Sequence, residues 1–171
     1  MEVRRQSQVS YLFSFGEREN MDATLVINRS QCRDVYPINQ ATWNLYEDAE
    51  RGGSHLTLQV IAERSICDQT DNNEPWWEVN LVEPGLAMAS LLPGAQFSVP
   101  QGYDESRGGH LTNLLDYAVH QDTDQNVVRI IAVEGNRLLV HLQGQATDGG
   151  FVTLCLEAWF VHNPATHRSI A

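Results

Sequence analysis

The feature that most constrains this fold is a period-two alternation of apolar side chains in the C-terminal third of the sequence. Every second residue is apolar over 138–142, and the same alternation returns over 152–160. Successive side chains of a strand point to opposite faces of a sheet, so each segment reads as a strand with one buried face. Turn residues precede both segments, at Gly135 and at 148–150. The sequence therefore predicts a three-stranded antiparallel meander over residues 127–161.

The rest of the chain repeats this pattern in shorter pieces separated by Gly, Pro, Asn and Asp. Further strands are predicted at 9–15, 23–27, 41–46, 55–63 and 76–82. The first two resemble a hairpin, residues 30–40 read as a loop, and residues 163–171 look like a frayed tail. Many short strands with turn residues between them predict an all-β protein, with residues 1–171 forming a single domain. We expect an antiparallel β-sandwich or a partly closed barrel.

One segment leaves an alternative open. Leu111, Leu114, Leu115 and Ala118 have helical spacing, whereas other positions within 111–119 fit a strand. A strand keeps the fold all-β. A helix near 111–119 would instead make the protein α+β.

The chain also carries a suspected internal duplication. The sequence Arg-Gly-Gly, followed closely by His-Leu-Thr, occurs from residue 51 and again from residue 107. Later glycines keep the same order, so that Gly94 of the first copy corresponds to Gly144 of the second. We read residues 41–94 and 97–144 as repeat units, each of about four short strands, related by an approximate two-fold.

The duplicated turns supply the first candidate binding site. Arg51 and His55 of one copy correspond to Arg107 and His110 of the other. If the two turns converge, two guanidinium groups and two imidazoles would bind an anion or a carboxylate. The plainer interpretation is that the glycines form turns and that each His ends a strand in solvent.

The adjacent Trp76 and Trp77 supply the second candidate, because neighbouring residues of a strand face opposite sides. The alternation places Trp77 inside, with Val79 and Leu81. Trp76 then faces outward, where it is available to stack on a sugar or to contact a partner. If the strand lies between two packed layers, both side chains belong to the core.

A cation site is weakly suggested by Asp122, Asp124 and Asn126, whose oxygen spacing resembles the start of a calcium-binding loop. Val127 stands where such a loop needs glycine, and no bidentate Glu follows at the required position. An ordinary polar loop accounts for the segment better. We therefore predict no bound metal and no cofactor.

The overall charge narrows the classes of partner. The formal net charge is -11, with 22 acidic and 11 basic side chains. This balance argues against binding to a phosphate backbone, which needs clustered Lys and Arg. The sequence contains no apolar run of membrane-spanning length. Three widely spaced cysteines, Cys32, Cys67 and Cys155, are typical of reduced thiols, so we expect a cytoplasmic protein.

No motif of nucleophilic, metal-dependent or phosphate-loop catalysis occurs in the sequence, and no catalytic residue is assigned. We expect a non-catalytic acidic interaction protein, such as an inhibitor, an immunity-type protein or an assembly subunit. It would bind a protein partner, and self-association is compatible with this expectation. The alternative is a module that binds a small ligand or a carbohydrate, conceivably a hydrolase.

Overall fold

The structure is a computed structural model that describes residues 22–48, 53–63, 74–83, 85–99, 103–104, 109–110, 113–117, 119–146 and 152–164. These residues form β-strands joined by turns, with one short 3-10 helix, η1 (Met88–Ser90). The predicted all-β class is confirmed. In the described part of the chain, no helix is long and apolar enough to cross a membrane.

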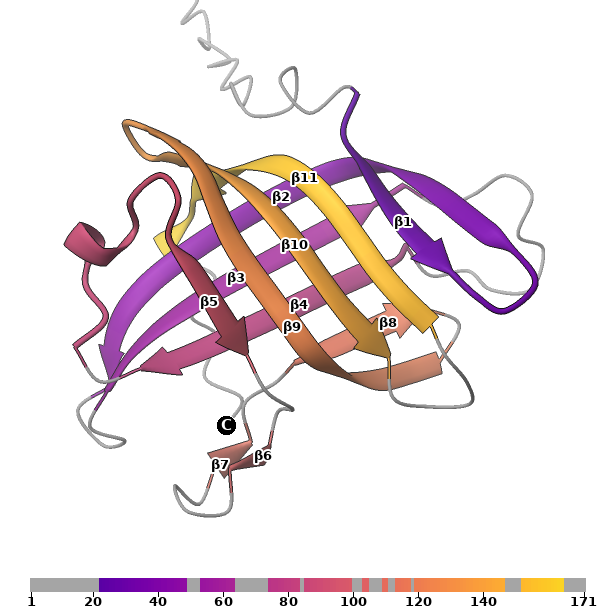
Figure 1. Cartoon of the computed structure of the whole chain (residues 1–171), viewed down its shortest axis with the longest axis horizontal. Coiled ribbons are helices and arrows are strands. Elements are labelled where there is room, and N and C mark those ends of the chain that lie inside the picture. The colour runs from indigo at the N-terminus through magenta and orange to yellow at the C-terminus, as the bar shows by residue number, and fades with distance from the viewer. Residues whose placement is uncertain are drawn as a thin grey trace, which may run out of the picture.

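Nine strands form the main sheet (Figure 1). They are β1 (Thr24–Asn28), β2 (Arg33–Asp48), β3 (Gly53–Ala62), β4 (Trp76–Glu83), β5 (Gln96–Val99), β8 (Leu114–Tyr117), β9 (Val119–Glu134), β10 (Arg137–Ala146) and β11 (Val152–His162). A separate two-stranded sheet pairs β6 (Tyr103–Asp104) with β7 (Gly109–His110). The order in the main sheet is β10-β11-β1-β2-β3-β4-β8-β9-β5, and β9 also pairs with β10, so the sheet returns on itself as a ring.

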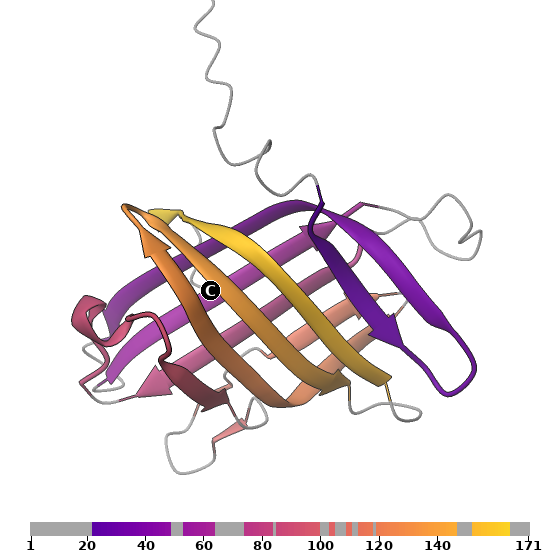
Figure 2. The same cartoon turned by 45° about the horizontal axis from the view of Figure 1, so that its top comes forward.

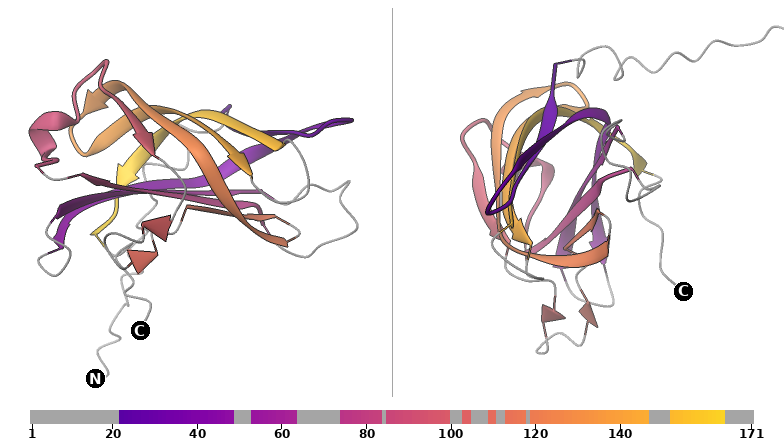
Figure 3. Two further views of the ribbon diagram at one scale, coloured as in Figure 1. Left: turned by 60° about the horizontal axis from the view of Figure 1, so that its bottom comes forward. Right: turned by 90° about the vertical axis from the view of Figure 1, so that its right-hand side faces the viewer.

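The ring is flattened into two layers whose strands cross steeply (Figures 1 and 2). One layer contains β2, β3, β4 and β8, and the other contains β5, β9, β10 and β11. Viewed end-on, the layers join into a continuous wall (Figure 3). The expected sandwich or partly closed barrel is therefore confirmed in this crossed form.

Two long strands form corners between the layers. β9 pairs with β8 over Val119–Asp122 and then with β10 from Thr123 onward. β2 pairs with β1 over residues 33–37 and with β3 from Ile38 onward, with a register shift between Ile38 and Gln40. Bulges bend a strand and increase its twist, which lets one strand belong to both layers.

The ring is completed where β1 lies between β2 and β11. Val26 is opposite Val35 of β2 on one side and Cys155 of β11 on the other. Farther along, β11 contacts β2 directly in a parallel pairing, with Val161 opposite Thr42. Both edges of β1 are thus occupied by these two strands.

The core lies between the two layers and is built from the inward faces of the strands. The predicted meander of β9, β10 and β11 is confirmed, with Leu154, Leu156 and Phe160 buried on one face of β11. Trp77 is completely buried, as the alternation in β4 predicted. Full burial of each large apolar side chain stabilises the fold by about 1.5–3 kcal/mol.

Two details of the expected organisation are wrong. Residues 30–40 are not a loop, because β2 begins at Arg33 and continues through Pro37. The hairpin partner of the strand near 23–27 is β2 rather than residues 9–15, which lie outside the described residues. For the ambiguous segment 111–119, the described part holds strand β8, so the helix of the α+β alternative is not formed there.

The structure agrees with the suspected duplication at one pair of glycines and disagrees with it at another pair. Gly85 of the first copy and Gly135 of the second, each nine residues before Gly94 or Gly144, both lie in turns with positive φ. Gly94 also lies in a turn with φ of 89°, but Gly144 lies inside strand β10 and is buried. The expected equivalence of Gly94 and Gly144 is therefore wrong. The duplication of 41–94 and 97–144 stays a prediction from sequence.

Candidate functional site

The candidate site lies on the inner wall of the barrel, where polar side chains of β9 face the core. Thr123 and Asn126 are both fully buried although they are three residues apart. A bulge explains this spacing: Asp124 is opposite Gln145 and Val127 is opposite Gln143, so two residues of β9 face Gly144 alone. Gln125, with φ of 50°, takes up the extra residue, and Asn126 returns to the inner face.

Gly144 provides the space in which Asn126 packs against Trp77. A Cβ atom at position 144 would lie 2.8 Å from Cζ2 of Trp77 and would collide with Oδ1 of Asn126. Because glycine has no side chain, both groups approach the backbone of β10 directly. The indole of Trp77 and the amide of Asn126 therefore lie beside each other at one point of the inner wall.

Three polar atoms at this wall, Nε1 of Trp77, Oε1 of Gln121 and Oδ1 of Asn126, are buried and have no hydrogen-bond partner among the described residues. Gln121 joins the same face because it is opposite Leu115 of β8, which in turn is opposite Trp77. Nδ2 of Asn126 donates a hydrogen bond to Oγ1 of Thr123 (3.1 Å), which leaves Oδ1 as the open acceptor. We call Trp77, Gln121 and Asn126 the inner polar site.

Asn113 fixes the relative position of the strands that carry the inner polar site. It stands just before β8, the strand that pairs with both β4 and β9. Its side-chain Oδ1 accepts a hydrogen bond from the backbone N–H of Asn80 in β4 (2.6 Å). Its backbone carbonyl accepts another from the N–H of Thr123 in β9 (2.8 Å). The buried Asn113 is therefore hydrogen-bonded to both β4 and β9.

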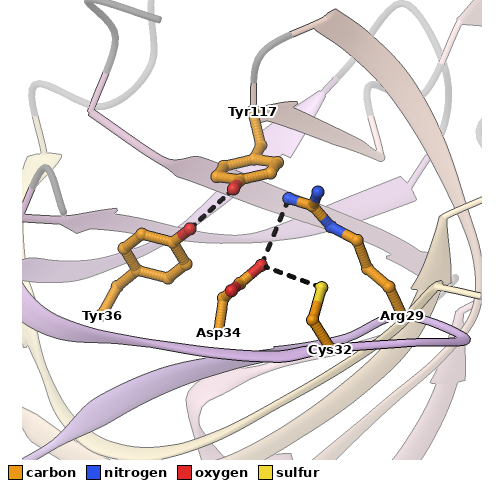
Figure 4. Close-up of polar contacts among 5 residues, drawn as sticks. All are labelled: Arg29, Cys32, Asp34, Tyr36 and Tyr117. Carbon is orange, nitrogen blue, oxygen red and sulfur yellow. Dashed lines mark hydrogen bonds and ion pairs between the residues drawn. The ribbon is translucent and has the colours of Figure 1, made fainter. Parts of the chain in front are cut away.

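A pair of tyrosines crosses the interior at the end of the barrel near the β1–β2 hairpin (Figure 4). The hydroxyl of Tyr36 on β2 donates to the hydroxyl of Tyr117 on β8 at 2.6 Å, in buried surroundings. β3 and β4 lie between these strands in the sheet, so the bond links two strands that are not neighbours. Tyr117 shares the inner face of β8 with Leu115, which places the pair next to the inner polar site.

Charged groups cover this tyrosine pair from the hairpin side. The guanidinium of Arg29 lies 4.7 Å from the ring centroid of Tyr117 and 3.3 Å from the carboxylate of Asp34. Burial acts to lower the pKa of Arg29, but Tyr117 and Asp34 outweigh it and raise that pKa. The thiol of Cys32 points at the same carboxylate (3.8 Å), as Figure 4 shows. The positive charge of Arg29 is therefore already compensated by Asp34.

The predicted anion site is only partly described. Arg51 and Arg107 lie outside the described residues, and of His110 only the backbone, in β7, is described. His55 does not end its strand in solvent: it is 2% exposed, and its ring stacks on Tyr46 with centroids 4.9 Å apart. The expectation of a solvent-exposed histidine at a strand end is wrong here, because His55 lies within β3 and the ring of Tyr46 in β2 stacks on it. Convergence of the four residues stays a prediction.

Trp76 lies on the outer face of β4, half-buried, between Ile61 of β3 and Asp116 of β8. Its outward direction agrees with the alternation that places Trp77 inside. A contact between Trp76 and a sugar or a partner stays a prediction.

The weak cation candidates do not form a loop. Asp122, Asp124 and Asn126 all lie within β9, and Asp124 accepts a hydrogen bond from the backbone N–H of Gln125. Asp122 is exposed whereas Asn126 is buried in the core, so the three side chains do not face one point. In the described part of the chain, no group of three His, Cys, Asp or Glu side chains is placed to hold a metal ion.

The sequence predicts a polar loop at Asn126 and does not indicate Gln121 or Trp77 as binding residues. A signal was present: Gln121, Thr123 and Asn126 interrupt the apolar pattern of a long strand. The bulge at Gln125 hid it, because the alternation changes phase there. Comparisons with protein-family models, curated proteins and solved structures found no match for this chain.

Proposed function

We propose that this protein binds a small molecule inside its barrel, at the inner polar site. The observation that supports the proposal is the set of buried, unpaired polar atoms on Trp77, Gln121 and Asn126. The indole of Trp77 and the amide of Asn126 lie beside Gly144, and Gln121 is on the same inner face of an otherwise apolar wall. Binding sites of this kind join an apolar lining to a few convergent polar groups.

Unpaired polar atoms in a core are costly relative to the stability of a whole domain. Each buried polar atom left without a hydrogen bond costs about 1–3 kcal/mol. Three such atoms together would therefore use a large part of the roughly 5–15 kcal/mol that stabilises an ordinary domain. A bound molecule that supplies the missing partners removes this cost. Ordered water also supplies hydrogen-bond partners to buried polar atoms in many proteins, so the test must distinguish a bound small molecule from water.

Thermal unfolding with a panel of small molecules tests the proposal, since a ligand of the folded state raises the melting temperature by mass action. The wild type should be stabilised by at least one compound in a concentration-dependent manner. Trp77→Phe, which keeps a ring but removes the N–H, should lose most of that response. Trp159→Phe, on the outer side of β11, is the matched control and should keep it. Equal responses of the two variants would contradict the proposed location.

A second candidate function, binding of a protein partner, is favoured by an apolar surface next to β5. Met88 and Leu92 are 54% and 59% exposed. The turn that contains Leu92 is held against β9 by hydrogen bonds of Gly94 and Ala95 with Ile130, beside the exposed Ile131. A net charge of -11 suits a partner with a basic rim around an apolar centre.

Light scattering during size-exclusion chromatography tests whether this surface joins two copies of the chain. If it does, the wild type should show a concentration-dependent dimer that Leu92→Ser abolishes. Val35→Ser removes another exposed apolar side chain, far from this surface in the sheet order, and should leave the dimer unchanged. A monomer at all concentrations would restrict the candidate function to a different protein as partner.

A further inference from the structure

We infer that the ligand of the inner polar site is an uncharged molecule in which a hydrogen-bond acceptor stands next to an N–H donor, as in a lactam. The inference rests on the proposed function and specifies its ligand class. It follows from the types of polar atom at the site, from the charges around them, and from the apolar residues beside them.

The first step concerns hydrogen-bond direction. The indole N–H of Trp77 can only donate, and Oδ1 of Asn126 can only accept. Oδ1 of Asn126 and the Cζ2 edge of the Trp77 indole both lie against Gly144, so one small molecule with neighbouring donor and acceptor atoms can reach both groups. The edge of a cyclic amide presents a carbonyl oxygen and an N–H side by side. The carbonyl would accept from Trp77 while the N–H donates to Asn126.

The second step concerns charge. Every buried polar residue in the described ranges is a Thr, an Asn or His55, and none is an Asp, Glu or Arg. His55 alternates with the core residues Leu56 and Leu58 of β3, so it is on the face away from the inner polar site, where it stacks on Tyr46. At the near end of the barrel, Asp34 already compensates Arg29 at 3.3 Å. An ionised ligand would lose its hydration without gaining an opposite charge, which is strongly unfavourable.

The third step concerns the body of the ligand. Leu115, Val128 and Leu142 neighbour Trp77 and Asn126 on the inner faces of β8, β9 and β10, and all are completely buried. Val128 is directly opposite Leu142, one step along the inner face from Gly144. These side chains favour a saturated or aromatic ring over further polar groups. A six-membered lactam combines such a ring with the required polar edge.

Nuclear magnetic resonance of the ¹⁵N-labelled protein can follow the indole N–H of Trp77 directly, assigned by its loss in Trp77→Phe. Three probes of similar size test the hydrogen-bond donor and the charge of the ligand separately. 2-Piperidone is neutral and has both a donor and an acceptor. Cyclohexanone is neutral and has the acceptor alone, and pentanoate is anionic. We expect 2-piperidone to shift the Trp77 indole signal in a saturable manner. Cyclohexanone should bind roughly two- to tenfold more weakly, the effect of one neutral hydrogen bond. Pentanoate should leave the signal unchanged.

Asn126→Leu is the matched variant for the donor step, because its side chain has nearly the same shape without the amide. In this variant, 2-piperidone and cyclohexanone should bind equally well. A preference for 2-piperidone that survives in Asn126→Leu would overturn the assignment of Asn126.

Each remaining outcome distinguishes the inference from the proposed function. Saturable binding of pentanoate at the Trp77 signal would overturn the neutral-ligand inference and leave the proposed function standing. Equal binding of cyclohexanone and 2-piperidone to the wild type would overturn the requirement for a donor. If none of the probes shifts the signal in the folded protein, the site holds water or protein atoms only, and both claims fall.

Discussion

At the scale of single residues, Gly144 has a role that its place in a strand does not suggest. Replacement of a strand glycine by alanine is usually favourable by roughly 0.5–1 kcal/mol, because alanine loses less backbone entropy on folding. At position 144 the added methyl group would collide with the side chains of Asn126 and Trp77. The structure therefore requires glycine for steric reasons rather than for its φ angle.

Gly144→Ala should lower the free energy of unfolding by about 1–3 kcal/mol, the usual cost of overpacking a core. Urea denaturation followed by tryptophan fluorescence measures the change. Gln143→Ala, at the neighbouring exposed position of β10, should stay close to the wild type. A Gly144→Ala protein as stable as Gln143→Ala would show that Asn126 and Trp77 do not pack against this strand.

In the ligand-free protein, the polar side chains of Thr123 and Asn126 should lower the free energy of unfolding. The double substitution Thr123→Val with Asn126→Leu keeps the shape of both side chains and removes the unpaired oxygen. We expect the free energy of unfolding to rise by about 1–3 kcal/mol, since a buried unsatisfied group is lost. Calorimetry without ligand measures the effect. A lower melting temperature would mean that these polar groups stabilise the core by themselves.

The sequence predicts which side chains of a strand face inward where the apolar alternation is unbroken. It does not predict them beyond a bulge. Trp77 could be placed inside because β4 alternates regularly from Trp76 onward. Asn126 could not, because the extra residue at Gln125 reverses the pattern within β9. Whether a single residue adopts an unusual backbone conformation depends on tertiary packing, which one sequence does not reveal.

At the scale of elements, the meander was predictable because its strands are neighbours in sequence and are joined by turn residues. β2 was missed because Pro37 and Asn39 suggest a loop. In the structure the register shift of β2 begins directly after Pro37, at Ile38 and Gln40. Proline is tolerated in sheets next to bulges, so the residues that looked like a strand breaker mark a corner of the barrel.

The inward face of β11 allows a direct test of the meander. Leu156→Ala should destabilise the protein by about 2–5 kcal/mol, because it leaves a cavity among fully buried neighbours. Thr153→Ala, at an exposed position of the same strand, should change stability by less than about 0.5 kcal/mol. Chemical denaturation of both variants provides the comparison. Similar values for the two would show that Leu156 is not part of the core.

The hydrogen bond between Tyr36 and Tyr117 should connect β2 and β8 energetically. Tyr36→Phe, Tyr117→Phe and the double variant form a thermodynamic cycle in which other contacts of each hydroxyl cancel. We expect a coupling energy of about 0.5–1.5 kcal/mol, typical of a neutral hydrogen bond. Additive effects of the two substitutions would indicate that the hydroxyls do not interact.

At the scale of the whole molecule, the sequence predicts the all-β class but not whether the sheet closes into a barrel. A sandwich and a partly closed barrel have the same strand pattern, and they differ in which distant strands pair. Closure here depends on β1 lying beside β11, and on β8 joining β4 to β9. These pairings connect segments far apart in sequence, and the periodicity of each segment carries no information about its partner.

Closure also explains why the inner polar site could not be predicted. Its residues come from β4 and β9, with Gly144 of β10 behind them, and only the closed wall brings these strands to one point. The sequence candidates were exposed turns and an outward tryptophan, the usual places for binding residues. The structure instead draws attention to polar atoms turned into the core.

The central claim is that Trp77 and Asn126 together bind one small polar molecule. A high-resolution crystal structure of the protein soaked with 2-piperidone tests it most directly. The account predicts density for the lactam with its oxygen about 3 Å from Nε1 of Trp77 and its nitrogen about 3 Å from Oδ1 of Asn126. A core in which both atoms are hydrogen-bonded to protein groups, with the lactam absent or bound elsewhere, would contradict it.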